Sequence, residues 1–391
     1  MPLGLYIAVP FCRTKCSYCN FASDVFSRAV FDNYIKRLCA EIEHSTRNAE
    51  QMRASLDRYV DSIYFGGGTP TLLNVAQLEH VFVTIRQNFQ VEKEAEITVE
   101  CAPGTLSGEM LEALVRCGVN RVSLGVQSFI DKEAASVGRL HKGQTVLDDI
   151  ARLRADGITN INVDLIAGLP HQTRESWENS LEQLISTGVP HASVYMLEVD
   201  EDSRLGRELM AGGQKYHAHF VPDEDLTADL YEIARDRLNA AGISQYEISN
   251  FARAGFESKH NLKYWTRQPY LGFGLDAHSM LPLRDGEAVR FSNSESLEKY
   301  LACEPASTVH VDQQMALEER LFLGLRLNRG VDIQYLQQEF PELFAAQKPV
   351  ISELMDSGML EQHDGVRIRL SSRGRLLSNE VFQRFLATAP A

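Results

Sequence analysis

The sequence predicts an α/β fold: a partial, open (β/α)6 barrel followed by a small C-terminal α+β domain that is winged-helix-like. Three observations lead to this prediction. Short apolar or β-branched segments recur six times within the first 200 residues, helical patterns lie between them, and the tail has helices followed by a hairpin pattern. A closed barrel of this type has eight strand–helix units, so six units indicate an open barrel.

Each apolar segment has the length and composition of a strand that is buried on both faces. The six predicted strands are residues 3–9, 62–65, 96–100, 121–126, 160–166 and 192–197. The predicted helices between them are residues 31–45, 75–88, 107–117, 145–156 and 174–186. Several of these helices are followed by a glycine at the expected C-cap, as at Gly118, Gly157 and Gly188. This alternation predicts a parallel sheet with helices outside it.

The rest of the chain predicts an extension and a separate tail. A helical pattern at 223–241 precedes a strand-like segment at 245–248 and a stretch rich in aromatic residues and glycine at 250–279. In the tail we expect helices at 316–327, 332–339 and 349–357, a hairpin at 359–370 with Asp364-Gly365 at its turn, and a final helix at 376–386. The predicted regions are therefore a barrel at 1–200, an extension at 201–305 and a C-terminal domain at 306–391.

Composition and charge restrict the class of protein. Hydrophobic residues are 44% of the chain and charged residues 24%, as is typical of a soluble globular protein. The formal net charge of −14 argues against nucleic acid as the main partner, because phosphate binding needs a basic surface. The seven cysteines favour reduced thiols over a disulfide framework. Without an apolar run long enough for a membrane helix or a secretory signal, we expect a cytoplasmic protein.

Three cysteines form a motif directly after the first predicted strand. Cys12, Cys16 and Cys19 have the spacing Cys-x3-Cys-x2-Cys. Thiolates are soft ligands that suit iron–sulfur clusters and zinc. A [4Fe–4S] cluster usually takes four cysteines, so three leave one iron open to a small chelating molecule. Zinc is the alternative, and it would need a fourth ligand, which no histidine before His44 supplies.

Further notable residues follow the other predicted strands. The run Gly66-Gly67-Gly68-Thr69-Pro70 follows the second strand, Glu100 ends the third, Gln127 follows the fourth and Asp164 lies on the fifth. Because the C-terminal ends of parallel strands meet at one mouth, these residues and the cysteines predict a single site. A glycine run lets backbone approach a ligand without obstruction by side chains. A carboxylate within an apolar strand needs a partner or a ligand.

The cysteine motif, the aromatic Tyr18 before its last cysteine and the glycine run together resemble the radical-SAM superfamily. That resemblance covers the whole predicted barrel. It implies a [4Fe–4S] cluster held by Cys12, Cys16 and Cys19, whose open iron is chelated by S-adenosylmethionine. An electron from the reduced cluster would then cleave a carbon–sulfur bond to give a 5′-deoxyadenosyl radical. The resemblance also implies a set of cofactor-binding residues, namely Tyr6, Tyr18, Gly67, Gly68, Thr69, Glu100, Gln127, Arg139 and Asp164.

Within the superfamily the chain resembles the coproporphyrinogen III oxidase-like subgroup, and most of all its HemW-type heme chaperones. At the position where the motif of the oxidases has a fourth cysteine, this chain has Phe21. Only 11 residues precede Cys12. A later segment, His260-Asn261-x2-Tyr264-Trp265, is similar to a heme-binding motif of these chaperones. Histidine is a usual axial ligand of heme iron, and aromatic rings can cover a porphyrin. The resemblance therefore implies heme bound by these four residues, with His278 as a weaker candidate ligand.

Several functions remain open from the sequence. The first is heme delivery, which implies heme, a heme-acceptor protein and an electron donor as partners, with a membrane-bound acceptor and a homodimer as further expectations. The second is the oxidative decarboxylation of coproporphyrinogen III. The third is a radical methyltransferase or another radical enzyme of this subgroup, because related barrels support varied chemistry. A core histidine packed by aromatic side chains is the structural alternative to a heme ligand at His260, and the sequence assigns no catalytic residue.

Overall fold

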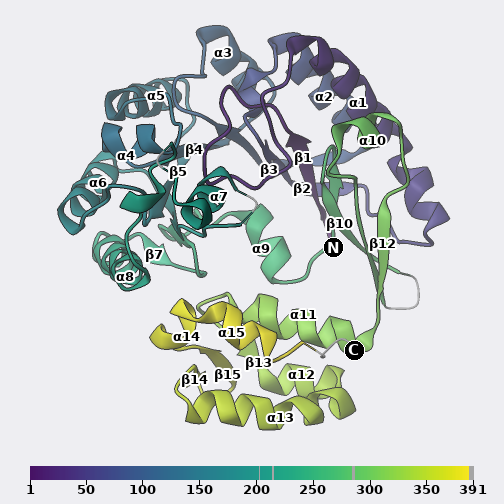
Figure 1. Cartoon of the computed structure of the whole chain (residues 1–391). Helices are drawn as coiled ribbons and strands as arrows, with labels where there is room; N and C mark the ends of the chain where they lie inside the picture. The colour runs from purple at the N-terminus through teal and green to yellow at the C-terminus, as the bar shows by residue number, and fades with distance from the viewer. Residues whose placement is uncertain (202, 214, 284–286, 387–391) are drawn as a thin grey trace.

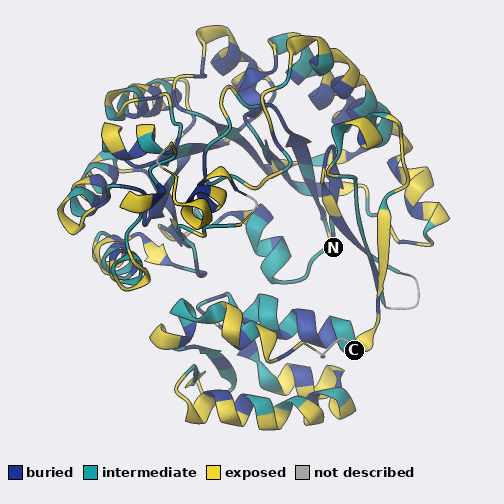
Figure 2. Ribbon diagram, in the orientation of Figure 1, coloured by how far each residue is buried: buried dark blue, intermediate teal, exposed yellow. Residues whose placement is uncertain are grey.

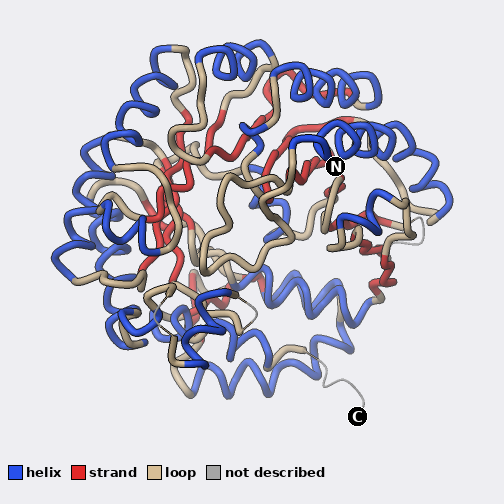
Figure 3. The backbone as a smooth tube through the Cα atoms, turned by 45° about the horizontal axis from the view of Figure 1, so that its top comes forward, coloured by secondary structure: helices blue, strands red, loops and turns tan. Residues whose placement is uncertain are grey.

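The computed structural model describes residues 1–201, 203–213, 215–283 and 287–386. Within these ranges, twelve strands form one sheet in the order β12-β11-β10-β9-β1-β2-β3-β4-β5-β6-β8-β7. Figure 1 shows this sheet curling inside an arc of helices, with the C-terminal region lying across its open side. The tube in Figure 3, which is turned toward the reader, shows the strands surrounding the loops of the barrel mouth.

The six predicted barrel strands are all present and parallel, which confirms the predicted α/β fold. They are β1 (Leu3–Val9), β2 (Tyr59–Gly67), β3 (Gln90–Cys101), β4 (Arg121–Gln127), β5 (Asn160–Ala167) and β6 (His191–Met196). Neighbouring strands pair in register, as with Tyr6 opposite Tyr64 and Glu100 opposite Ser123. This register brings the C-terminal ends of all six strands to one edge, where the loops carrying the predicted site residues begin.

Helices connect the strands and cover the outside of the sheet (Figure 1). They are α1 (Arg28–Gln51), the 3-10 turn η1 (Pro70–Leu72), α2 (Val75–Asn88), α3 (Gly108–Arg116), α4 (Asp131–Ser136), α5 (Gly143–Ala155) and α6 (Arg174–Thr187). The helix α4 was not predicted, because six residues are too few for a helical period to show. Side chains cap several of the others: Asn74 and Thr173 form capping boxes at the starts of α2 and α6.

The sheet continues beyond both edges of the barrel. At the β6 edge, β8 (Asn250–Ala252) and β7 (Ser244–Gln245) add antiparallel strands. At the β1 edge, β9 (Tyr270–Phe273) pairs in parallel with β1, followed by β10 (His278–Pro282), β11 (Ala288–Ser292) and β12 (Ser307–Val311). The intervening helices are α7 (Arg204–Ala211), η2 (Ala218–Phe220), α8 (Glu224–Ala240), α9 (Lys259–Trp265) and α10 (Leu297–Leu301). The extension thus belongs largely to the same sheet as the barrel.

The tail has the predicted winged-helix-like order of elements. It comprises α11 (Gln313–Leu325), β13 (Val331–Asp332), α12 (Ile333–Glu339), α13 (Pro341–Asp356), β14 (Leu360–His363), β15 (Arg367–Leu370), α14 (Ser372–Leu376) and α15 (Ser378–Gln383). Its sheet has the order β13-β15-β14. Asp364 and Gly365 both have positive φ, 51° and 78°, at the hairpin turn as predicted.

Two predicted helix boundaries in the tail are wrong. Pro349 does not start a helix: α13 begins at Pro341, whose ring suits the first helical turn, and continues through Pro349. The helix expected at 376–386 is shorter: α15 covers only Ser378–Gln383, and the separate helix α14 (Ser372–Leu376) ends before it, at the break at Leu377 (φ −107°, ψ 31°). Packing of the apolar face of α13 against the tail outweighs the hydrogen bond that an internal proline removes. The last residues of the predicted domain, 387–391, lie outside the described residues.

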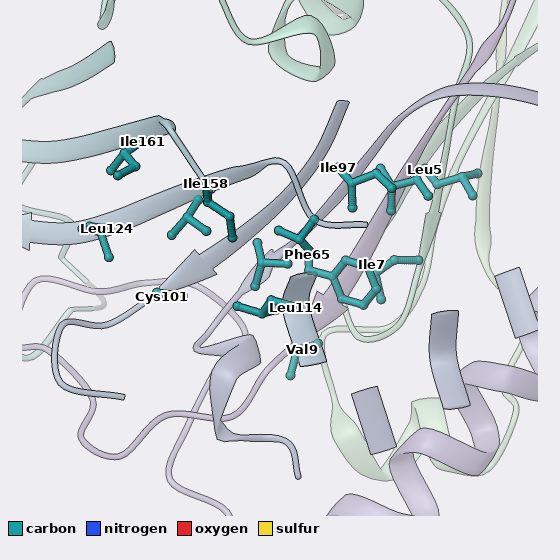
Figure 4. Packing of buried hydrophobic residues seen from close by; sticks show 14 of the residues in the cluster. Leu5, Ile7, Val9, Phe65, Ile97, Cys101, Leu114, Leu124, Ile158 and Ile161 are labelled. Atoms are coloured by element: carbon teal, nitrogen blue, oxygen red, sulfur yellow. The ribbon is translucent and has the colours of Figure 1, made fainter. Parts of the chain in front are cut away.

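The core lies between the sheet and its helices. Figure 4 shows apolar side chains from alternate strand positions, among them Leu5, Ile7 and Phe65, packed together with Leu114 of α3. Figure 2 shows the same division, with buried strands inside and helices exposed on their outer faces. The other face of the strands, which the sequence predicts to be buried as well, is polar. It turns polar side chains inward, namely Ser62, Glu96, Thr98, Glu100, Arg121, Ser123, Asn162, Asp164, His191 and Ser193.

Candidate functional site

A cavity of about 890 Å³ opens at the C-terminal ends of the barrel strands. It brings together residues from β2, β3, β4 and β5, the cysteine loop and the tail segment at 376–380. Of the residues predicted to bind the cluster or S-adenosylmethionine, those that line it are Cys12, Cys16, Cys19, Tyr18, Gly67, Gly68, Thr69, Glu100, Gln127, Arg139 and Asp164. The curled sheet therefore collects side chains that lie up to 152 positions apart in the chain, from Cys12 to Asp164.

The cysteine loop is held by backbone hydrogen bonds rather than by its own side chains. The N–H of Cys12 donates to the carbonyl of Asp24 at 3.0 Å, and the N–H of Ser17 donates to Val137 at 3.2 Å. Leu205, in the first turn of α7, donates to the carbonyl of Ser17 at 2.8 Å. The three thiols are free and half-exposed to the cavity. Burial raises the pKa of Cys12, so an electropositive ligand is needed to hold its thiolate form.

The thiols fit a cluster better than a single metal ion. Among the described residues, no group of three or more His, Cys, Asp or Glu side chains is arranged to hold one ion. Cys12, Cys16 and Cys19 do not form such a group either, so the donors alone indicate the kind of site, and these are three soft thiolates with no histidine in their loop. The three soft donors lie on one loop and face a cavity that is large enough for a second molecule. This arrangement suits an iron–sulfur cluster with an open iron.

The glycine run packs directly against the strand that leads to Cys12. A Cβ atom on Gly68 would lie 2.7 Å from the carbonyl oxygen of Val9 and 2.8 Å from that of Phe11. The next residue, Thr69, donates its N–H to Phe11 at 2.8 Å. Gly67 has φ +95°, which side chains disfavour. The run is thus needed to bring the β2 loop and the cysteine loop together at the rim of the cavity.

Two carboxylates face the cavity from β3 and β5, the strands on either side of β4. Glu100 accepts a hydrogen bond from the Tyr64 hydroxyl at 2.8 Å and another from the backbone N–H of Gly67. Asp164 accepts from the Nδ2 of Asn162 at 2.7 Å and from the Ser123 hydroxyl at 3.2 Å. Enclosure by the barrel wall, followed by repulsion from Asp164, raises the pKa of Glu100 to about 7. Each carboxylate is therefore oriented by donors and retains acceptor capacity toward the cavity.

The remaining predicted contacts lie beside β4, between the strands that carry the two carboxylates: a Cβ on Gly125 would lie 3.1 Å from Nη2 of Arg139 and 3.3 Å from Nε2 of Gln127. Arg139 donates from its Nη2 to the Tyr18 hydroxyl at 3.3 Å, whereas its buried Nε has no acceptor among the described residues. Gln127 adopts φ +71°, a left-handed conformation that is uncommon for residues other than glycine. Such a strained residue at a cavity indicates a functional constraint. The unsatisfied guanidinium fits a bound carboxylate, as a methionyl group would supply.

The titration of Glu100 predicts a pH dependence of cofactor binding. Because its pKa is about 7, the carboxyl is mostly protonated at pH 6 and mostly ionised at pH 8. With Glu100 at the cofactor ribose, as the resemblance implies, the ionised form accepts hydrogen bonds from the hydroxyls better, so binding of S-adenosylmethionine should strengthen about 10-fold from pH 6 to pH 8, the ratio of the ionised fractions. Calorimetric titration of the anaerobically reconstituted protein measures this. Glu100→Gln should remove the dependence, and a variant that keeps it would contradict the assignment.

Tyr6 and the predicted heme segment lie elsewhere. The Tyr6 ring stands inside the barrel below the cavity, with its hydroxyl beside Gly67. The residues His260, Asn261, Tyr264 and Trp265 belong to α9, which sits between the sheet and the tail (Figure 1). Among the described residues that line the cavity, none comes from α9. Ser62 and Gly4 contact His260 near the N-terminal ends of their strands, so α9 closes the opposite end of the barrel.

Several inward-facing polar residues were missed in the sequence. Tyr64 and Ser123 hold the two carboxylates, and Asn162 links Asp164 to Ser193 and His191. All of them occupy alternate positions within strands that were interpreted as uniformly apolar. The available signal was the spacing of Asn162 two positions before Asp164 on β5, which puts both side chains on one face of the strand.

Comparisons with known proteins agree with the geometry. The model of the radical SAM superfamily matches residues 6–184, and that of the HemN C-terminal domain matches residues 311–377. A heme chaperone HemW of Lactococcus lactis is 34% identical over 98% of this chain and 97% of its own. The heme chaperone HemW of Bacillus subtilis is 36% identical over 97% of this chain and 98% of its own.

A solved structure is similar over both parts of the chain. The radical SAM enzyme coproporphyrinogen III oxidase (HemN) of Escherichia coli has a TM-score of 0.83 at 25% identity, with 98% of this chain and 90% of the other covered. The similarity spans the barrel and the tail together. It follows that the strand ends, the cysteine loop and the tail segment that line the cavity belong to one conserved architecture rather than to unrelated domains.

Proposed function

The chain belongs to the radical SAM superfamily, as a HemW-like protein, and we propose that it acts as a heme chaperone that binds heme and transfers it to an acceptor protein. The observation that carries this proposal is similarity at 34–36% identity over at least 97% of the chain to two proteins named heme chaperones. That similarity includes α9 and the tail as well as the cluster site. Phe21 in place of a fourth cysteine supports the same direction.

The cofactor site is proposed to hold a [4Fe–4S] cluster on Cys12, Cys16 and Cys19. When bound, a reduced cluster supplies one electron for cleavage of a carbon–sulfur bond of S-adenosylmethionine. The Arg139 guanidinium is suited to the methionyl carboxylate by its planar fork and by its unpartnered Nε. The backbone of Gly67, Gly68 and Thr69 is suited to the methionyl amine, since side-chain atoms do not obstruct it.

The carboxylates and the tyrosine complete the proposed cofactor contacts. Glu100 is placed to accept hydrogen bonds from ribose hydroxyls, and Asp164 extends the same acceptor surface along the next strands. Gln127 adds an amide at the rim, and Tyr18 covers the side nearest the cysteines. These side chains orient the cofactor and exclude water beside it, and no catalytic residue is assigned to them.

The heme site is proposed to involve His260, with Asn261, Tyr264 and Trp265 of the same helix. In this conformation the His260 ring has both nitrogens engaged: Nδ1 with the Ser62 hydroxyl at 3.1 Å and Nε2 with the Tyr264 hydroxyl at 2.9 Å. Its side chain is 1% exposed. Coordination of heme iron therefore requires α9 to turn out of the barrel end and release Nε2. His278 is exposed and is the second candidate.

A heme titration tests this site. Anaerobically reconstituted protein should develop one Soret band that saturates at about one heme per chain, as a single axial histidine predicts. His260→Ala should shift that band and weaken heme affinity by about 10-fold or more, whereas His80→Ala, at an exposed position on α2, should change neither. Heme binding that is lost in His278→Ala but not in His260→Ala would move the ligand to β10.

The oxidation of coproporphyrinogen III is the second candidate function. The specific observation in its favour is the similarity to the Escherichia coli enzyme over barrel and tail. The cavity of about 890 Å³ also has room beside the cofactor. Under this alternative, reconstituted protein with reductant and S-adenosylmethionine would release carbon dioxide from coproporphyrinogen III and form protoporphyrinogen. Neither product should form if the protein is a chaperone only.

The proposed partners follow from heme delivery. They are a heme-acceptor protein and a one-electron donor for the cluster, with a homodimer and a membrane-bound acceptor as further proposals. Among the described residues, no helix is long and apolar enough to cross a membrane.

A further inference from the structure

The helix α9 closes the N-terminal end of the barrel through buried charges. The Glu96 carboxylate accepts hydrogen bonds from the backbone N–H groups of Lys259 and His260, both at 3.1 Å. Lys263, which is 2% exposed, pairs with Asp61 at 2.8 Å. Because a buried charge without its partner is strongly unfavourable, these pairs fix the helix at the barrel end. The position of His260 inside the barrel is thus set by its own helix N-terminus.

The His260 ring is held in one orientation and in one charge state. Both nitrogens have partners, the hydroxyls of Ser62 and Tyr264. Burial, reinforced by the positive charges of Lys263 and Arg121, lowers the pKa of His260 to about 3. The ring is therefore neutral near pH 7. Its two hydroxyl partners also prevent it from rotating, so it presents one flat face.

Two tyrosine rings lie on that surface. The centroids of His260 and Tyr64 are 5.4 Å apart with 29° between the planes, and those of His260 and Tyr6 are 6.4 Å apart with the same angle. Tyr6 and Tyr64 are themselves 6.1 Å apart and inclined by 24°. Such offset stacking stabilises each ring position beyond simple burial. The three rings form a continuous group, which we call the aromatic floor.

The aromatic floor reaches the cofactor site. The Tyr64 hydroxyl donates to Glu100 at 2.8 Å. The Tyr6 hydroxyl lies 3.4 Å from where a Cβ on Gly67 would stand, directly below the glycine run. On the other side, a Cβ on Gly4 would lie 2.7 Å from the Lys263 side chain and 3.3 Å from the His260 ring, so β1 packs closely against α9 at this point.

We propose that His260 is a positioning residue of the S-adenosylmethionine site, acting through Tyr64 on Glu100 and through Tyr6 on the glycine run. This inference rests on the proposed placement of S-adenosylmethionine beside Glu100. It gives His260 a role in the ligand-free conformation that is separate from heme. If heme takes Nε2, the ring leaves the floor, so heme and S-adenosylmethionine should each weaken the binding of the other by an equal factor.

The experiment measures the affinity of S-adenosylmethionine for the reconstituted full chain by equilibrium dialysis without heme. We expect Tyr64→Phe to weaken binding about 10-fold, because a charge-assisted hydrogen bond to Glu100 is lost while the ring remains. His260→Ala should weaken binding by a similar factor. The double variant should bind less weakly than the product of the two single effects predicts, because both changes act on Glu100, although only His260→Ala also acts through Tyr6. His80→Ala is the matched control and should bind like the unaltered protein.

Cluster content and thermal unfolding of each variant show whether it is folded. His260→Gln keeps a polar side chain but removes the ring, so it should resemble His260→Ala in affinity while remaining more stable. Unchanged affinity for S-adenosylmethionine in both His260 variants would overturn the positioning role. It would also be overturned if binding by the double variant were weakened by the full product of the factors measured for His260→Ala and Tyr64→Phe. If Glu100→Gln left the affinity for S-adenosylmethionine unchanged, the proposed placement of the cofactor beside Glu100 would be wrong. That outcome is distinct from a failure of the positioning role of His260.

Discussion

Replacing Cys12, Cys16 and Cys19 together with alanine should leave a folded chain that has lost its iron–sulfur cluster. Anaerobically reconstituted protein should contain about four irons per chain, as a cubane requires, and the triple variant nearly none. Binding of S-adenosylmethionine should fall below detection, because the open iron that chelates it is gone. Iron and sulfide analysis, with the visible absorption band of the cluster, measures the first effect, and dialysis the second.

The triple variant should remain folded because backbone groups hold the loop. The N–H groups of Cys12 and Ser17 donate to Asp24 and Val137, and these bonds do not need the thiols. Cys303→Ala removes an exposed thiol that lies outside the cavity and should retain a full cluster. A triple variant that still binds four irons would contradict the ligand assignment. Iron loss from Cys303→Ala would point to a different set of ligands.

Gly68→Ala should have the second large effect. The new methyl group would lie within 3 Å of the carbonyl oxygens of Val9 and Phe11, which are backbone atoms and cannot turn away. The β2 loop and the cysteine loop must then separate, and overpacking of this kind lowers the free energy of unfolding by about 1–3 kcal/mol. The displacement of the two loops should also weaken S-adenosylmethionine binding about 10-fold, which corresponds to about 1.4 kcal/mol.

Gly108→Ala is the control for that substitution. Gly108 starts α3, and a Cβ there would meet no atom within 4 Å. Alanine is a better helix former than glycine by about 1 kcal/mol, so this variant should be unchanged or slightly stabilised. Chemical denaturation gives both stabilities and dialysis both affinities. Equal behaviour of Gly68→Ala and Gly108→Ala would show that the close approach at the glycine run does not matter.

Local patterns predicted the barrel and much of the site. Segments such as Leu3–Val9 and Val75–Asn88 were predicted with the bounds that the structure has, because apolar periodicity and an N-cap such as Asn74 act within a few residues. The convergence of the cysteine loop, the glycine run and Glu100 followed from one rule, that parallel strands end at a common edge. These features depend on short-range chemistry and on the handed connectivity of the fold.

Other features depend on contacts between distant parts of the chain. Ser62 and His260 touch although they are 198 positions apart, and no local pattern near His260 indicates that α9 enters the barrel. The pairing of β9 with β1 also joins distant parts of the chain, since Gly4 lies opposite Tyr270. The helix α13 runs through Pro349 because tertiary packing outweighs local preference. The polar residues that face the inside of the barrel were not predicted, because apolar residues alternate with them along the strands.

Heme binding without porphyrinogen oxidation would distinguish a heme chaperone from an oxidase, and one paired measurement tests this directly. The same batch of reconstituted protein, loaded with S-adenosylmethionine and reductant, is titrated with heme and, separately, incubated with coproporphyrinogen III. The account predicts a saturating Soret band at about one heme per chain and no protoporphyrinogen in the parallel sample. No heme binding together with release of carbon dioxide and formation of protoporphyrinogen would contradict it.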